Sequence, residues 1–457
     1  MAQPASKEVP VEPVTTGPPP LTPPAELDQT QMIPTGHGFS SVLKNRSFLV
    51  IWSAQIASQV AQNSIWFVLI ILIAKITGGS ALGIGGIIIM VQLPTVLFSS
   101  VSGVLVDRVS KKAVLIATNA IRAVAVVGYL VFSGYGEALY LITFFVSVVS
   151  QPFQPAEGAT IPLLVTDDQL ITANSLFQAT FMGSQIVGFA MAPILLQFAG
   201  QTITFFVLIG MFAYAAAILV LLPPITTRRT VVQSTGMIDS AEKIWLELLE
   251  GLRAILADRK LLMAIIQITF APTLLLLVAQ VAPGFAREVL HTAYTAMFWV
   301  LAPAGLGMGI GLFILGHWGA RLRKDRLVVV ALLALSITIL GLADVPSLAH
   351  EFWLPFSVIG INPAPNVERL LTMIPISLLL GIEIAFINAP IQTIVQERAP
   401  ERLRGRILAM QQTLTAAVAI IPLLLIGGIA AAVGVQGALS LIGVVLFVVA
   451  LASVYEI

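Results

Sequence analysis

Residues 81–112 read ALGIGGIIIMVQLPTVLFSSVSGVLVDRVSKK, a long apolar run that ends in a short segment with one acidic and three basic side chains. A helix needs roughly 20 apolar residues to cross ~30 Å of hydrocarbon, and the run 81–105 is long enough. Backbone groups in lipid must be paired within the segment, so we predict a helix here and in every similar run. The predicted spans are 48–75, 81–105, 113–133, 137–162, 170–198, 202–222, 261–286, 294–317, 327–343, 370–396, 406–430 and 435–455.

Composition independently places the chain in a membrane. Its 457 residues are 57% hydrophobic and 10% charged, whereas soluble domains average roughly 25% charged residues. The net charge of +1 and the dispersed basic residues argue against a nucleic-acid partner. The chain has no cysteine, its histidines lie far apart, and no nucleophile, base and oxyanion donors converge. We therefore expect no metal site, no cofactor and no enzyme activity.

Three polar segments lie outside the predicted spans. Residues 1–43 are rich in proline and lack the apolar core of a signal peptide, so we predict a disordered tail. Residues 223–260 are predicted to be a linker, with an amphipathic helix that carries Ile244, Leu248 and Leu252 on one face. Residues 344–369 contain four prolines and are predicted to form an extended loop.

The distribution of basic residues predicts the topology. Of the 24 Lys and Arg residues, only Lys75, Arg287 and Arg369 fall on the side opposite the termini, and Arg122 lies within a span. Cytoplasmic loops of membrane proteins are enriched in Lys and Arg. We therefore predict a multi-pass protein with both termini in the cytoplasm.

The loops after the second and eighth predicted spans carry similar patterns. The first reads Gly103-Val-Leu-Val-Asp107-Arg108-Val-Ser110-Lys111-Lys112. The second reads Gly316-His-Trp-Gly-Ala320-Arg321-Leu-Arg323-Lys324-Asp325-Arg326. A glycine, an acidic or small residue and a basic cluster recur at matching offsets, which indicates that two halves of the chain are related.

With these loops the chain resembles the major facilitator superfamily, whose loop motif reads glycine, three residues, aspartate, arginine, any residue, glycine, then basic residues. The first copy matches, except that Ser110 replaces the second glycine; in the second copy Ala320 replaces the aspartate. The resemblance covers 48–457. It implies an all-α membrane protein with about twelve transmembrane helices in two pseudo-symmetric six-helix halves, at 44–222 and 261–457, and a monomer in the lipid bilayer.

Two further stretches are similar to the branch that holds macrolide-efflux proteins and siderophore exporters. They are Gln154-Pro155-Ala156 with Leu170-Ile-Thr-Ala-Asn174, and Asn388-Ala-Pro390 with Arg404-Gly405-Arg406. The span-five antiporter motif of the branch is degraded, and only Gly188, Ala192 and Pro193 remain. The resemblance implies a drug:proton antiporter in a bacterial plasma (inner) membrane.

The loop motif suggests a gating role. Asp107 could bond the amides of a neighbouring helix N-terminus, whose partial charge is positive. The basic residues could pair with Glu157, Asp167 or Asp168, and such contacts would form in one state and break in another as the halves rock. The alternative is that they only set topology. The candidate gating residues are Gly103, Asp107, Arg108, Lys111, Lys112, Gly316, Arg321 and Lys324.

Two charges stand out inside predicted spans, where charges are costly and usually functional. The resemblance places span ten, with Glu383, against the central cavity, and a carboxyl group in a partly dry cavity can bind and release a proton near physiological pH. We predict Glu383 as the proton-coupling acid; the alternative is a structural carboxyl bonded to a neighbouring helix. Arg122 is predicted to have a structural or gating role, either paired with a carboxylate or snorkelling to the interface.

Amides and aromatic residues mark a candidate substrate cavity. On span one they follow helical spacing along one face, although bonding between helices is an equal alternative. The family's cavity-lining spans carry no clear Lys or Arg, so we predict an amphipathic substrate rather than a phosphate or dicarboxylate. The candidate cavity residues are Gln55, Gln59, Gln62, Trp66, Phe144, Gln151, Gln154, Gln267, Asn388 and Gln392.

These features predict a secondary transporter that exports a small drug, macrolide or siderophore in exchange for protons. An uptake carrier or lysophospholipid flippase shares the predicted architecture. A non-transporting membrane sensor or scaffold is the alternative from another class, and it predicts no flux and tolerance of substitution at Glu383.

Overall fold

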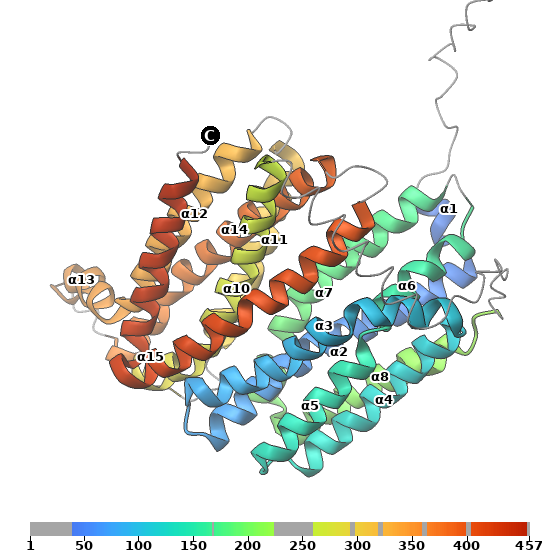
Figure 1. The fold of residues 1–457 in the computed structure, drawn as a ribbon. Helices are drawn as coiled ribbons and strands as arrows, with labels where there is room; N and C mark the ends of the chain where they lie inside the picture. The colour runs from blue at the N-terminus through green and yellow to red at the C-terminus, as the bar shows by residue number, and fades with distance from the viewer. Residues whose placement is uncertain are drawn as a thin grey trace, which may run out of the picture.

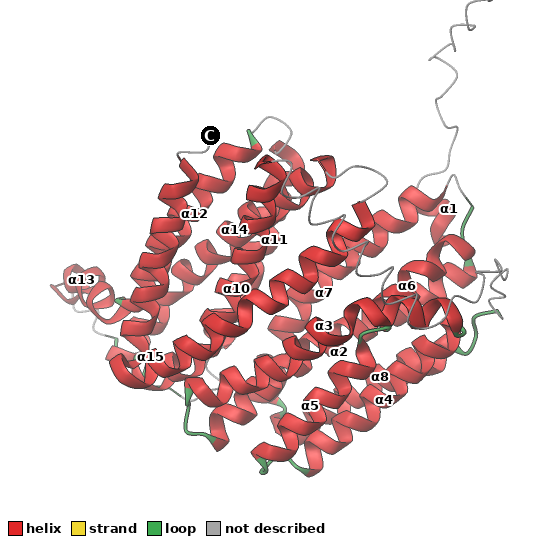
Figure 2. Cartoon of the chain, in the orientation of Figure 1, coloured by secondary structure: helices red, strands yellow, loops and turns green. Residues whose placement is uncertain are grey.

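The computed structural model describes residues 39–166, 169–223, 259–292, 298–318, 323–358, 363–398 and 404–454. These ranges are almost entirely α-helical and contain no strand (Figure 2). This confirms the predicted all-α class. The predicted tail up to residue 38, the amphipathic linker helix and the loop acids Asp167 and Asp168 lie outside the described residues.

The N-terminal half consists of two short helices and a bundle of longer ones. Their bounds are α1 Phe39–Leu43, α2 Arg46–Ile76, α3 Ala81–Arg108, α4 Lys111–Val131, α5 Gly136–Ser150, α6 Phe153–Thr160, the 3₁₀ turn η2 Ile161–Leu163, α7 Leu170–Phe198 and α8 Gly200–Leu219. Polar side chains cap the N-termini of several of these helices. The Asn45 side chain accepts hydrogen bonds from the amides of Ser47 and Phe48 at the start of α2, and Ser80 and Ser110 cap α3 and α4.

The C-terminal half repeats the bundle. Its helices are α10 Arg259–Glu288, α11 Phe298–Trp318, α12 Lys324–Ala343, α13 Val345–Val358, α14 Pro365–Arg398 and α15 Arg404–Val454. Within α15, Gly434 has φ 77° and ψ 171°, a conformation that glycine adopts readily and other residues do not. The chain bends there, so α15 comprises two spans.

Ten described helical stretches are long and apolar enough to cross a membrane. The last, Thr413–Ser453, has 41 residues, or about 61 Å at the helical rise of 1.5 Å, twice the hydrocarbon thickness. The break at Gly434 divides this stretch into two spans. Helix α10, which packs on α14 and α15, is a further span, so the described helices account for the twelve predicted spans.

Three local expectations need correction. Residues 344–369 are not an extended loop, because α13 occupies Val345–Val358. Residues 39–43, assigned to the tail, form α1, and the side chain of Val42 in this helix is fully buried in a cluster with Phe48 and Ile51. The linker ends two residues earlier than predicted, since α10 begins at Arg259.

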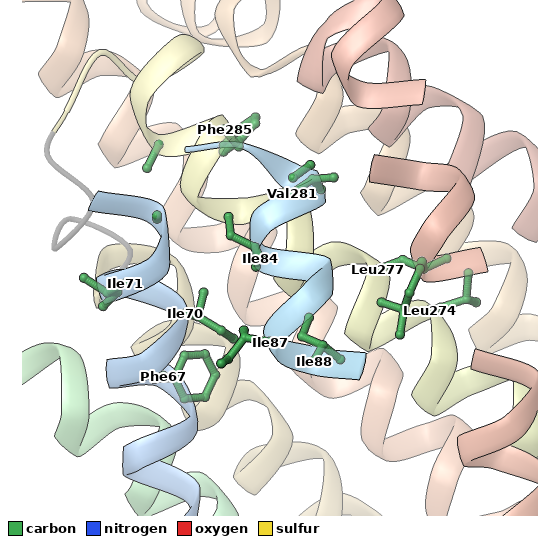
Figure 3. Packing of buried hydrophobic residues seen from close by; sticks show 14 of the residues in the cluster. Phe67, Ile70, Ile71, Ile84, Ile87, Ile88, Leu274, Leu277, Val281 and Phe285 are labelled. Atoms are coloured by element: carbon green, nitrogen blue, oxygen red, sulfur yellow. The ribbon is translucent and has the colours of Figure 1, made fainter. Parts of the chain in front are cut away.

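The two halves meet along α3, α7, α10, α11 and α15 (Figure 1). Helix α3 of the N-terminal half runs beside α15 of the C-terminal half, and α7 packs on α11. Figure 3 shows the core at this boundary, where Ile84, Ile87 and Ile88 of α3 are buried near Phe67 and Ile70 of α2 and near Leu274 and Leu277 of α10. The bounds of the two halves as independent units remain a proposal.

Candidate functional site

Arg122 sits inside the N-terminal half and does not snorkel. Its side chain is 6% exposed. Nε donates to Ser150 Oγ at 3.0 Å and one terminal nitrogen donates to Ser58 Oγ at 3.1 Å. The guanidinium carbon lies 4.6 Å from the centre of the Phe153 ring, within the range of a cation–π contact. Arg122 therefore joins α4 to α2 and to the α5–α6 region.

A small cavity with both polar and apolar walls adjoins Arg122. Its volume is about 20 Å³, enough for a single water molecule. Gln62 and Trp66 of α2, Tyr129 of α4 and Thr143 of α5 contribute to its wall. Gln62 Oε1 is buried and has no hydrogen-bond partner in the described part of the chain. The cavity is too small for a drug-sized molecule in this conformation.

The predicted polar face of α2 divides between two roles. Gln62 and Trp66 line the cavity. Gln55 instead donates from Nε2 to the Phe177 carbonyl at 3.3 Å, which ties α2 to α7. Gln59 is buried between them. Bonding between helices and lining of a cavity, the two alternatives for this face, therefore both occur.

The fourth span contributes less to the cavity than predicted. Gln151 Nε2 donates to Thr95 Oγ1 of α3 at 3.2 Å and to the Ser147 carbonyl. Gln154 is exposed, and Phe144 packs edge-on against Phe145. The helix is interrupted between Ser150 and Phe153, as the proline at 152 predicts.

Glu383 lies between two helices of the C-terminal half. Its side chain is 8% exposed. Thr338 Oγ1 on α12 donates to Glu383 Oε1 at 2.8 Å, whereas Oε2 is buried with no partner among the described residues. The bond to α12 is what a structural carboxyl group bonded to a neighbouring helix would make. The unpartnered Oε2 atom is free to bind a proton. On the same helix Asn388 and Gln392 are half-buried; the Gln267 side chain lies outside the described residues.

The loop motif anchors helices within the N-terminal half. Lys112 Nζ donates to the carbonyls of Val220 and Leu222 at the end of α8. Free carbonyls at a helix C-terminus favour such a cation. Glu157, one of the three carboxylates that could pair with the basic residues, is buried in α6, and Lys112 bonds the α8 carbonyls in this conformation. Lys111 is buried at the first position of α4.

The structure describes the other residues of the loop motif only in part. Helix α3 ends at Arg108, and the side chains of Asp107 and Arg108 lie outside the described residues, as does Arg321. In the second copy, Gly316 is exposed with open space around it, and Lys324 begins α12. The gating role of these residues remains a prediction.

Two hydrogen-bonding residues link the halves at the end of the bundle that carries the α2–α3 turn. Gln280 of α10 is fully buried, and its Nε2 donates to the Ala81 carbonyl of α3 at 2.7 Å and to the Leu423 carbonyl of α15 at 2.9 Å. One terminal nitrogen of Arg287 donates to the Gly78 carbonyl at 2.9 Å. Sequence reasoning missed Gln280, although a glutamine in an apolar span is itself a signal of interhelical bonding.

The glycines of the eighth span serve packing. A Cβ at Gly307 would collide with the Leu378 carbonyl of α14, and one at Gly311 would lie 2.8 Å from Ala385 Cβ. On the other face of α11, Gly305 and Gly309 approach Ile186 of α7. One glycine face therefore packs within the C-terminal half and the other packs between the halves.

Comparison with known proteins gives a consistent assignment. The sequence profile of the Major Facilitator Superfamily matches residues 51–421. Macrolide efflux protein A of Streptococcus pyogenes is 30% identical over 152 residues, which are 32% of this chain and 37% of that protein. The match thus spans little more than a third of that relative.

Solved transporter structures share the fold at low sequence identity. The nucleoside transporter NupG superposes with a TM-score of 0.66 at 12% identity, covering 90% of this chain and 98% of that one. The POT family transporter PepTSo superposes with a TM-score of 0.66 at 12% identity, covering 90% and 97%.

Proposed function

The chain belongs to the major facilitator superfamily and is a multi-pass membrane transporter of a small-molecule substrate, and on this premise we propose that it exports a small amphipathic compound in exchange for protons. The candidate substrates are a macrolide, another drug or a siderophore. The observation that carries the export proposal is the 30% identity to macrolide efflux protein A. We further propose a monomer in a bacterial inner membrane with cytoplasmic termini, which places the α2–α3 turn outside the cell.

Alternating access is supported by where the halves touch. At the α2–α3 end, Gln280 and Arg287 hold the Gly78–Ala81 backbone, and a Cβ at Gly284 would lie 3.5 Å from the Gly79 carbonyl oxygen. Towards the other end the bond between Ser99 and Thr413 hydroxyls, 3.1 Å long, joins α3 to α15. In our proposal the conformation described here is closed to the outside, and it opens when the α2–α3 end separates.

Proton coupling is supported by Glu383. The acid is buried in the middle of α14 with one oxygen unpartnered. An ionised carboxylate left there with a single hydroxyl donor would be costly, whereas the neutral acid is tolerated. Glu383 would thus take up a proton in one state and release it in another.

The test uses purified protein in liposomes with a preset pH gradient and a fluorescent pH reporter. A lipophilic cation, a macrolide, a siderophore and a lysolipid are added one at a time to wild type and to Glu383→Gln. We expect one compound to dissipate the gradient with wild type alone. Tracer flux without any gradient response would instead make the protein a facilitator or flippase, and equal responses from both proteins would remove Glu383 from the mechanism.

A further inference from the structure

A second buried acid lies in the opposite half of the molecule. Glu157 of α6 is 6% exposed, and so is Arg122 of α4. The two charges act on each other electrostatically. Ionisable residues inside membrane spans are costly and mark functional sites by default.

The pair is not joined by a hydrogen bond in this conformation. Arg122 donates hydrogen bonds to the hydroxyls of Ser58 and Ser150. Glu157 accepts no hydrogen bond from any residue in the described part of the chain. An ionised carboxylate with no donor is expensive to bury, whereas a neutral carboxyl group is far less so. The geometry therefore suits a protonated Glu157 whose guanidinium neighbour is bonded elsewhere.

The charges around Glu157 are few. Helix α6 packs on α4, α3 and η2. Helix α4 contributes Arg122 and, at its first two positions, Lys111 and Lys112, of which Lys112 is bonded to the end of α8. The turn η2 contains no charged residue. The charged side chains of α3, Asp107 and Arg108, lie outside the described residues.

The cavity beside Arg122 provides a polar route to the face of α2. Arg122 and Gln62 both line it, and Gln62 Oε1 has no partner. A water in this space, which holds about one, would accept a hydrogen bond from Arg122 and donate one to Gln62. Through Arg122, the cationic member of the pair, the charges are thus connected to the candidate substrate face.

We propose that Glu157 is a second proton-carrying group, located in the N-terminal half, with Arg122 as its counter-charge. With the proton bound, the pair carries one positive charge; after the proton leaves to water, the pair is neutral and Glu157 can bond Arg122 directly. The protonated pair repels a cationic group at the α2 face, and the deprotonated pair admits one. Proton release and binding of a positively charged substrate are thereby linked, and this last step rests on the proposed exporter function.

The proton site itself can be tested without a substrate. Buried protonated carboxyl groups give a C=O stretching band in the infrared, which a pH titration of the purified protein in lipid would follow. We expect Glu157→Gln to remove one titrating component that Glu383→Gln retains. Glu137→Gln is the matched control, because Glu137 is an exposed acid at the start of the same span, and its spectrum should match wild type in this band. A Glu157→Gln spectrum identical to wild type would overturn the proposal.

Transport then separates this proposal from the exporter function. In the liposome assay, Glu157→Gln should lose the gradient response while Glu137→Gln keeps it, and Glu157→Asp should retain part of it if the carboxyl group is what matters. A full response from Glu157→Gln, with wild type also responding, refutes the role of Glu157 and leaves the exporter intact. If wild type gives no response to any compound, the exporter proposal fails, and the infrared titration still decides whether Glu157 carries a proton.

Discussion

Gln280 provides the sharpest test of how the outer end is held shut. Its amide nitrogen bonds Ala81 across the halves and Leu423 within its own half. Only the first bond must break when the halves separate. A hydrogen bond between neutral groups contributes about 1 kcal/mol net. Gln280→Leu should therefore shift the equilibrium towards the outward-open state by about 1 kcal/mol, which is about fivefold.

Leucine is a suitable replacement because it keeps nearly the same volume. A Cβ at Gly85 would collide with the Gln280 amide, so α3 and α10 are in close contact there and a smaller residue would leave a cavity. Gln280 Oε1 is buried without a partner in the described part of the chain, and leucine also removes this unsatisfied acceptor. We expect the melting temperature to change little while the conformational equilibrium moves.

The assay exploits the absence of cysteine from the chain. Ala81 is 8% exposed at the junction of the halves, and the Ala81→Cys variant can be labelled from outside with a membrane-impermeant maleimide. Adding Gln280→Leu should raise the labelling rate about fivefold, as the shift of about 1 kcal/mol requires. Gln436→Leu is the control, because Gln436 bonds the Ala343 carbonyl within the C-terminal half. An unchanged rate with Gln280→Leu, or an equal rise with the control, would refute the reasoning.

Three further predictions concern packing and anchoring. In a melting assay in detergent, Gly307→Ala should lower stability by about 1–3 kcal/mol through overpacking against the Leu378 carbonyl. Gly316 has open space around it, so Gly316→Ala should be neutral or slightly stabilising. Equal behaviour of the two variants would contradict the packing. Lys112→Met removes both bonds to the end of α8 and should lower the melting temperature, while Lys75→Met, outside this contact, serves as the reference that should stay near wild type. The double variant Ser99→Cys with Thr413→Cys should cross-link α3 to α15 under mild oxidation, because the parent hydroxyls are 3.1 Å apart. Transport should then stop until a reductant is added. The control pair, Ser99→Cys with Thr415→Cys, should cross-link poorly, since position 415 is turned by about 200° around the helix from position 413.

Span positions were predictable because they follow from length and hydropathy. The predicted starts of the third and sixth spans fall within two residues of α4 and α8. The region 344–369 was misjudged because its prolines suggested an extended loop, although Pro346 occupies the first turn of α13, where its missing N–H costs nothing. Composition cannot distinguish these cases, since tolerance of proline depends on its position relative to the helix start.

The candidate site was predictable only in part. Glu383, Arg122, Gln62 and Trp66 could be identified because polar residues in apolar spans are rare and costly. Their partners could not. Ser58 and Ser150, which bond Arg122, are separated from it by 64 and 28 residues, and serine is unremarkable in a membrane helix. Thr338, the donor to Glu383, is equally inconspicuous.

The sequence by itself determined that this chain is a twelve-span membrane protein of two related halves, since apolar length and the loop repeat are local properties of the chain. The sequence also determined which positions within the spans carry a charge. Only the tertiary structure decided which of them meet: Glu157 lies buried in α6, where its charge and that of Arg122 act on each other, and Gln280 bridges the halves. These pairings depend on the rotation and crossing of packed helices, where one residue of register turns a side chain by about 100° and so changes its partner.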